Sequence, residues 1–124
     1  MSEQLPFLGK QLVLELYECP LEIIDNQLIV EQALLATAAA IQATVVDIVF
    51  HKFSPQGVSG VVVIMESHIA IHTWPEHGYA AVDIFTCGDM DLAPGVEVIR
   101  TLLQAGRVKE QLIFRGKGAR VPGL

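Results

Sequence analysis

Polar side chains that could do chemistry gather in the middle of the chain, among segments that are otherwise strongly apolar. They are Ser59, Glu66, Ser67, His68, His72, Trp74, Glu76, Asp83 and Cys87. A polar group on an apolar strand loses free energy on desolvation unless it finds a hydrogen-bond partner. The cluster therefore indicates either a satisfied structural network or a functional site.

Metal binding is one interpretation of the cluster. His68 and His72 lie four residues apart, with His77 and Cys87 nearby in the sequence. On a strand, however, residues four apart are separated by about 13 Å. Without a bend the two imidazoles could not share an ion, so the spacing argues against a metal site.

Two other interpretations remain from the residue types alone. Cys87 could be a nucleophile that His72 activates, although a lone cysteine at a strand end is more often a small apolar residue. Alternatively, Ser59, Ser67 and the histidines could simply satisfy a hairpin. Each residue taken singly fits this structural interpretation.

The hydrophobic pattern around the cluster predicts an α+β domain. Alternation and β-branched residues predict strands over 10–18, 44–53, 58–66, 68–74, 79–86 and 108–114, with 58–74 forming either two strands or one bent at Ser67. Helical spacing predicts one helix capped by Asp25 or Asn26, with Val30, Leu34, Ala38 and Ile41 inward. It predicts a second helix capped by Asp91, with Val96, Ile99, Leu102 and Leu103 inward.

Short connections between the central strands favour a mainly antiparallel sheet with both helices on one face, a two-layer sandwich. The other face would need a cover, which a second subunit could supply. The 124 residues are enough for a single domain spanning 1–124. The 52% hydrophobic content and the mean hydropathy of +0.46 also indicate burial against another chain, so we expect a homo-oligomer, namely a dimer.

Charge and hydropathy exclude some classes of binding partner and indicate where in the cell the protein is located. The net charge of −6 argues against nucleic acid. Charged residues interrupt every apolar run before the roughly 20 residues of a membrane span. The start, MSEQLPFLGK, lacks the order of a signal peptide. Cys19 and Cys87 are too few for a disulfide framework, so we expect a cytoplasmic protein.

The string from Gly57 to Gly88, GVSGVVVIMESHIAIHTWPEHGYAAVDIFTCG, resembles the bacterial and archaeal S-adenosylmethionine decarboxylases. The similar motifs are the GVSG turn, the Glu-Ser-His run, IHTWPE and YAAVDIFTCG. Weaker similarity through LGKQLVLELYEC, DNQLIVEQAL and FHKF extends the resemblance to about two thirds of the chain. Gln11 departs from a frequent histidine and Met65 from a common small residue. The tail FRGKGARVPGL matches no motif.

The resemblance implies a proenzyme that cleaves its own backbone between Glu66 and Ser67, giving a β chain of residues 1–66 and an α chain of residues 67–124. Ser67 would attack the preceding carbonyl and, after elimination and hydrolysis, become a pyruvoyl cofactor that forms a Schiff base with the substrate. By the same resemblance, Ser59 assists processing and His72 is the proton acceptor in it. Cys87 is the proton donor in catalysis.

The resemblance also implies S-adenosylmethionine as substrate and, as product, the aminopropyl donor for spermidine biosynthesis. Phe53 and Trp74 would stack on the adenine, and Glu76 would accept hydrogen bonds from the ribose hydroxyls. Two alternatives remain open. One is a pyruvoyl-dependent decarboxylase of arginine or ornithine, and the other is a non-processing subunit that pairs with an active partner.

Overall fold

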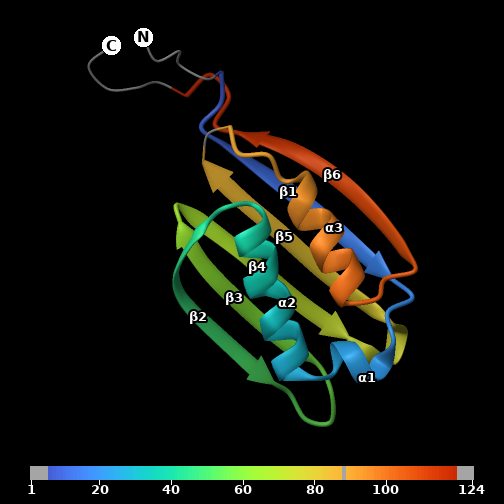
Figure 1. Cartoon of the computed structure of the whole chain (residues 1–124). Helices are drawn as coiled ribbons and strands as arrows, with labels where there is room; N and C mark the ends of the chain where they lie inside the picture. Colours follow the sequence, from blue (N-terminus) through green and yellow to red (C-terminus); the bar gives the residue numbers. More distant parts are fainter. Residues whose placement is uncertain (1–5, 88, 120–124) are drawn as a thin grey trace.

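A computed structural model describes residues 6–87 and 89–119 as a six-stranded sheet with helices packed on it (Figure 1). The strands are β1 (Gly9–Tyr17), β2 (Thr44–Lys52), β3 (Val58–Met65), β4 (Ser67–Trp74), β5 (Tyr79–Cys87) and β6 (Arg107–Arg115). The helices are α1 (Leu21–Ile24), α2 (Gln27–Ala40), the short 3-10 helix η1 (Pro75–His77) and α3 (Ala93–Leu102).

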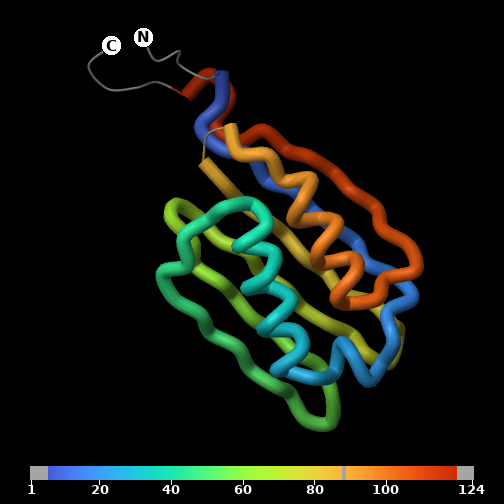
Figure 2. The backbone as a smooth tube through the Cα atoms, viewed as in Figure 1, coloured from blue at the N-terminus to red at the C-terminus, as the bar shows by residue number. Residues whose placement is uncertain are grey.

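The sheet order is β2-β3-β4-β5-β1-β6, and every neighbouring pair is antiparallel. Figure 2 follows the backbone from α2 into a meander through β2, β3, β4 and β5, while β1 lies between β5 and β6. The two long helices, α2 and α3, lie side by side on one face of the sheet (Figure 1). The predicted α+β class, with an antiparallel sheet and both helices on one face, is confirmed.

The core lies between the helices and the sheet because strand side chains alternate between its two faces. Leu12, Leu14 and Leu16 of β1 point toward the helices and are buried. From the helix side, Val30, Leu34 and Ala38 of α2 and Ile99 of α3 fill the same core. The predicted inward positions Val30, Leu34 and Ala38 of the first long helix are thereby confirmed.

The opposite side of the sheet, here called the open face, is presented by the alternate residues of each strand. It includes Ser59, Val61 and Val63 of β3, His68 and His72 of β4, and Asp83 of β5. Several of its apolar side chains are exposed: Val49, Val61, Val63, Met65 and Trp74. The polar cluster of the sequence therefore lies beside uncovered apolar surface.

The ends of the helices refine two predictions. Asn26 caps α2, since its side-chain oxygen accepts a hydrogen bond of 3.1 Å from the backbone N–H of Ile29. Asp91 accepts from the backbone N–H of Ala93 at 3.1 Å, although the cap position of α3 is Leu92. Of the four residues of the second helix that were expected to face inward, Val96, Ile99 and Leu103 are buried. Leu102 is 42% exposed, because at 100° per residue it lies off the face that the other three share.

Within the described residues no helix is both long and apolar enough to cross a membrane. Residues 1–5, Gly88 and 120–124 lie outside the described part of the chain. The expectations about the extreme N-terminus, the last residue of the YAAVDIFTCG motif and the end of the tail fall on these residues.

Candidate active site

The candidate residues fall into two groups on the sheet, and the first contains Ser67 and Cys87. Ser67 is the first residue of β4 and pairs with Thr86 of β5, so Cys87 follows its pairing partner directly. The Oγ of Ser67 lies 3.6 Å from the Sγ of Cys87. The chain thus brings the candidate cofactor residue and the candidate proton donor into contact.

The predicted cleavage site lies at the tip of a tight hairpin. Because Ile64 of β3 pairs with Ser67 of β4, only Met65 and Glu66 form the connection. Ser67 has a φ of 142°, a value that residues with a side chain rarely adopt and that costs about 1–3 kcal/mol. The sequence allowed two strands or one bent strand here, and the structure has two strands with a strained backbone at Ser67.

Thr86 adds a second polar group to this end of the sheet. Its hydroxyl is buried, with 1% of the residue exposed, and has no hydrogen-bond partner among the described residues. A buried hydroxyl without a partner is costly in a finished structure. A carbonyl-bearing group at position 67 would need a hydrogen-bond donor and a proton donor nearby. Thr86 and Cys87 offer one each, so the residues around position 67 fit a pyruvoyl group.

The second group contains Ser59 and His72. They are direct partners in the β3–β4 register, and the Oγ of Ser59 lies 2.8 Å from the Nδ1 of His72. Both side chains are on the open face. A hydrogen bond at Nδ1 fixes the orientation of the imidazole and leaves Nε2 for an incoming group. The pair therefore has the form of an oriented general base.

The two groups do not meet within one chain. Ser67 and His72 are five residues apart on the same strand, which corresponds to about 16 Å. His72 pairs with Ala81, six residues before Cys87, which corresponds to about 20 Å. The alternative in which His72 activates Cys87 is therefore wrong for the single chain, and the Ser59–His72 pair cannot reach Ser67 of its own chain.

The candidate substrate residues lie at the same end of the sheet as Ser59 and His72. Phe53 and Trp74 are 46% and 42% exposed. The N–H of Phe53 donates to the carbonyl of Gly57 at 2.8 Å, and continuing the β3–β4 register by two residues places Gly57 opposite Trp74. A glycine, with φ +114°, thus lies between the two aromatic residues and adds no side chain of its own there.

Further aromatic residues lie next to Trp74 on the neighbouring strands of the sheet. The rings of Trp74 and Tyr79, and those of Tyr79 and Tyr17, have centroids 5.4 Å apart. An open cavity of about 420 Å³ is lined by Tyr17, Trp74, His77 and Tyr79. Glu76, which is exposed, lies in η1 between Trp74 and Tyr79. This surface offers stacking partners and a carboxylate acceptor close together.

The structure has a polar network beside Ser67 that the sequence analysis did not predict. The Nε2 of His68 lies 2.8 Å from the Oδ2 of Asp83, which also accepts a hydrogen bond of 3.2 Å from Gln11. Arg115 donates in turn to the side-chain oxygen of Gln11. The alternation of β4 and β5, which puts His68 and Asp83 on one face, was the signal that could have found this network.

Among residues 6–87 and 89–119, no three His, Cys, Asp or Glu side chains are grouped so that they could hold a metal ion. Cys19 and Cys87 are both free thiols. Burial raises the pKa of Cys19 to about 11, while Cys87 is exposed. Of the two cysteines, only Cys87 is placed for chemistry.

Comparison with known proteins gives a consistent result. A sequence model described as S-adenosylmethionine decarboxylase matches residues 10–116. The S-adenosylmethionine decarboxylase proenzyme of Pseudomonas aeruginosa is 51% identical over 118 residues, covering 94% of this chain and 74% of that one. That of Thermotoga maritima is 53% identical over 102 residues, covering 82% and 78%. The crystal structure of the adenosylmethionine decarboxylase from Aquifex aeolicus superposes with a TM-score of 0.82 at 36% identity, covering 89% and 92%.

Proposed function

The chain belongs to the S-adenosylmethionine decarboxylase family, and we propose that it is a proenzyme that cleaves itself before Ser67 and then decarboxylates S-adenosylmethionine. The observation that carries the proposal is the position of Ser67. It stands at a hairpin tip with a strained backbone, and its Oγ is 3.6 Å from the thiol of Cys87. The product would be the aminopropyl donor for spermidine biosynthesis.

Cleavage follows from the chemistry of Ser67 itself. Its Oγ attacks the carbonyl carbon of Glu66, and the amide becomes an ester as the C–N bond breaks. A base then removes the Cα proton of residue 67, the Cβ–Oγ bond breaks, and Glu66 leaves as the carboxylate end of the β chain. The remaining dehydroalanine tautomerises and reacts with water, which releases ammonia and leaves a ketone. The strain at Ser67 favours the first step because the strained φ of this residue is relieved when the C–N bond breaks.

Decarboxylation uses the residues around position 67. When present, the pyruvoyl group supplies carbonyls that withdraw electrons from the substrate carbon that loses carbon dioxide. Cys87 holds a proton on its Sγ and delivers it to that carbon once carbon dioxide has left. Thr86 pairs with residue 67 across the β4–β5 ladder and supplies a buried hydroxyl as hydrogen-bond donor. Protonation at the cofactor carbon, and not at the substrate carbon, would inactivate the enzyme by transamination. The position of the thiol therefore decides which carbon receives the proton.

A homodimer would bring His72, the proposed general base, to Ser67, which it does not reach within its own chain. Since the Ser59–His72 pair lies about 16 Å from Ser67 along β4, a second copy must bring this pair to the cleavage site. A two-fold axis would pair each end of the open face with the opposite end of the partner and give two complete sites. The exposed apolar residues support contact through this face; they are Val49, Val61, Val63 and Met65.

The same arrangement explains the substrate contacts. Phe53, Trp74 and Glu76 lie at the end of the sheet that carries His72, so the second copy would present them together with its base. Adenine would stack on Phe53 and Trp74, and Glu76 would accept from the ribose hydroxyls. Arginine and ornithine have no planar ring to stack, so the exposed aromatic pair favours the nucleoside substrate. The free thiols agree with a cytoplasmic location.

Intact-mass measurement of the purified protein tests the proposal. We expect two fragments that end at Glu66 and begin at residue 67, with the second carrying a blocked terminus that gains hydrogen on borohydride reduction. The Ser67→Ala chain should remain whole. The cleaved protein should decarboxylate S-adenosylmethionine in preference to arginine and ornithine. A wild-type chain that stays intact would overturn the enzyme assignment and favour the non-processing subunit.

A further inference from the structure

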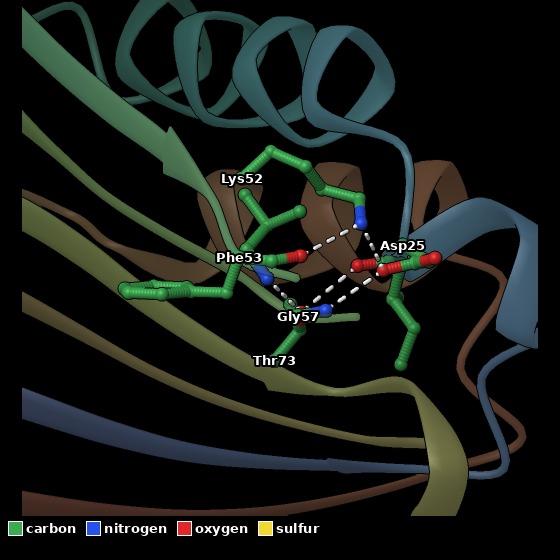
Figure 3. A network of polar contacts seen from close by, with 7 residues as sticks. Asp25, Lys52, Phe53, Gly57 and Thr73 are labelled. Atoms are coloured by element: carbon green, nitrogen blue, oxygen red, sulfur yellow. Dashed lines mark hydrogen bonds and ion pairs between the residues drawn. The ribbon is translucent and has the colours of Figure 1, made fainter. Parts of the chain in front are cut away.

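The aspartate that lies two residues before α2 contacts the turn between β2 and β3 (Figure 3). The Oδ1 of Asp25 accepts a hydrogen bond of 2.8 Å from the backbone N–H of Gly57. The same oxygen lies 3.1 Å from the Nζ of Lys52. Asp25 therefore joins the α1–α2 junction to both sides of the turn between β2 and β3.

The contacts of Asp25 with Lys52 and Gly57 fix the backbone of Phe53. Its carbonyl accepts a hydrogen bond of 3.0 Å from the Nζ of Lys52, and its N–H donates to the carbonyl of Gly57 at 2.8 Å. The two residues that Asp25 binds are thus the two that fix the backbone of Phe53. Phe53 is 46% exposed, and its ring meets that of His51 in a T-shaped contact with the ring centroids 4.4 Å apart. The backbone contacts, more than packing, determine where the ring lies.

A second hydrogen-bonded link ties the same junction to the strand that carries Trp74. The hydroxyl of Thr73 accepts from the N–H of Val58 and donates to the carbonyl of Ile24, each at 2.9 Å. Thr73 is buried and directly precedes Trp74. Adjacent residues, Ile24 and Asp25, therefore anchor the segments on which the two aromatic residues stand. The hydrogen bond from Gly57 lowers the pKa of Asp25, so the side chain is a carboxylate at neutral pH.

We propose that Asp25 is a positioning residue for the substrate, which sets Phe53 at a fixed separation from Trp74 so that a purine ring fits between them. The inference rests on the proposed function and adds to it a residue remote from the open face. A ring held in place before binding loses little freedom when the purine arrives, whereas a loose turn must be ordered at that moment. Loss of Asp25 should therefore weaken substrate binding and leave the chemical steps unchanged.

Steady-state kinetics of Asp25→Asn, Asp25→Ala and Lys52→Met test whether Asp25 affects substrate binding without affecting the chemical steps. We expect cleavage as complete as in the wild type, an unchanged kcat and a KM raised about three- to tenfold. Asp25→Ala should show the larger effect because it removes the acceptor for Gly57 as well as the charge. Asp25→Glu should restore part of the wild-type KM. Glu97→Gln, which breaks an exposed ion pair with Arg100 on α3, is the matched control and should leave KM unchanged.

A binding measurement provides a readout that does not depend on turnover. Trp74 is the only tryptophan of the chain, so its fluorescence should be quenched when a purine stacks on it. The probe is 5′-methylthioadenosine, which carries the nucleoside but no reactive amine. In the cleaved enzyme, its dissociation constant should rise about three- to tenfold in the Asp25 variants and stay the same in Glu97→Gln.

The outcomes separate this inference from the proposed function. A wild type that decarboxylates S-adenosylmethionine, with Asp25 variants of unchanged KM and unchanged probe affinity, would overturn the positioning role alone. So would a lower kcat or slower cleavage at unchanged KM, because these would make Asp25 a general structural residue. Lys52→Met decides the matter if Asp25→Ala fails to fold. A wild type that neither cleaves nor turns over substrate would remove the proposed function itself.

Discussion

The Oγ of Ser59 on β3 and the Nδ1 of His72 on β4 lie 2.8 Å apart, and His72 is five residues along β4 from Ser67. If a second copy supplies the pair, two defective chains should complement each other. We expect that Ser67→Ala and His72→Ala chains, produced separately, each remain largely uncut. Produced together, the His72→Ala chain should be cleaved, because its intact Ser67 then meets His72 of the other chain.

Differently tagged chains and intact-mass analysis would show which chain is cut. The Ser67→Ala chain should stay whole in the mixture and serve as the internal control. Mixed dimers that are isolated through both tags, yet contain no cleaved His72→Ala chain, would exclude a shared site. Cleavage of the His72→Ala chain alone, at the wild-type rate, would remove His72 from the reaction.

Gly60 should be sensitive to substitution because of its partner across the β2–β3 pair. Phe50 lies opposite Gly60, and a Cβ at position 60 would stand 2.1 Å from the Phe50 ring. Gly60→Ala should lower the free energy of unfolding by about 1–3 kcal/mol, the usual cost of overpacking. Urea unfolding measures the change. Adding Phe50→Leu should recover part of the loss, and a double variant less stable than Gly60→Ala would contradict this explanation.

Local patterns predicted the elements because each pattern depends on its own segment. The alternation of Leu12, Leu14 and Leu16 was enough to predict β1, and the spacing of Val30 and Leu34 was enough for α2. The sheet with its helices on one face then followed from the order and length of the connections. The four-residue helix α1 was missed, since a single turn leaves no periodic pattern.

Relations between distant segments were harder to predict. Ser67 and His72 are close in sequence, and the resemblance assigned them to one reaction, but a straight strand separates them. The rise per residue that argued against a metal shared by His68 and His72 applies equally to this pair. Asp25 looked like a helix cap because aspartate and asparagine are both good caps. Its contact with Gly57, 32 residues away, has no local signature.

The two cysteines should differ sharply toward thiol reagents. Cys19 is 4% exposed, and burial raises its pKa to about 11, whereas Cys87 is exposed. Because the thiolate is the reactive form, iodoacetamide at pH 8 should modify Cys87 in the folded protein and spare Cys19. Peptide mapping would locate the label, with the urea-unfolded protein as the control in which both react. Preferential labelling of Cys19 in the folded protein would contradict the structure.

Stability should depend on pH through Asp25, whose pKa is lowered first by the hydrogen bond from Gly57 and then by Lys52. A carboxyl whose pKa is lower in the folded than in the unfolded chain stabilises the fold above its unfolded value, near 3.8. This stabilisation disappears as the pH falls through the lower, folded value. Asp25→Asn should therefore cost about 1 kcal/mol at pH 7, a modest figure because solvent partly screens the site.

Urea unfolding at pH 7, 5, 4 and 3 would measure this dependence. The difference in unfolding free energy between the wild type and Asp25→Asn should stay constant down to about pH 4, near the unfolded pKa of an aspartate, and shrink below it. Lys52→Met should keep most of the pH dependence, because the hydrogen bond from Gly57 remains. If Lys52→Met removes the dependence as completely as Asp25→Asn does, the ion pair and not the backbone hydrogen bond is the main cause. A difference that grows toward pH 3 would mean that the folded chain binds the proton more tightly, the opposite of what the contact with Gly57 requires.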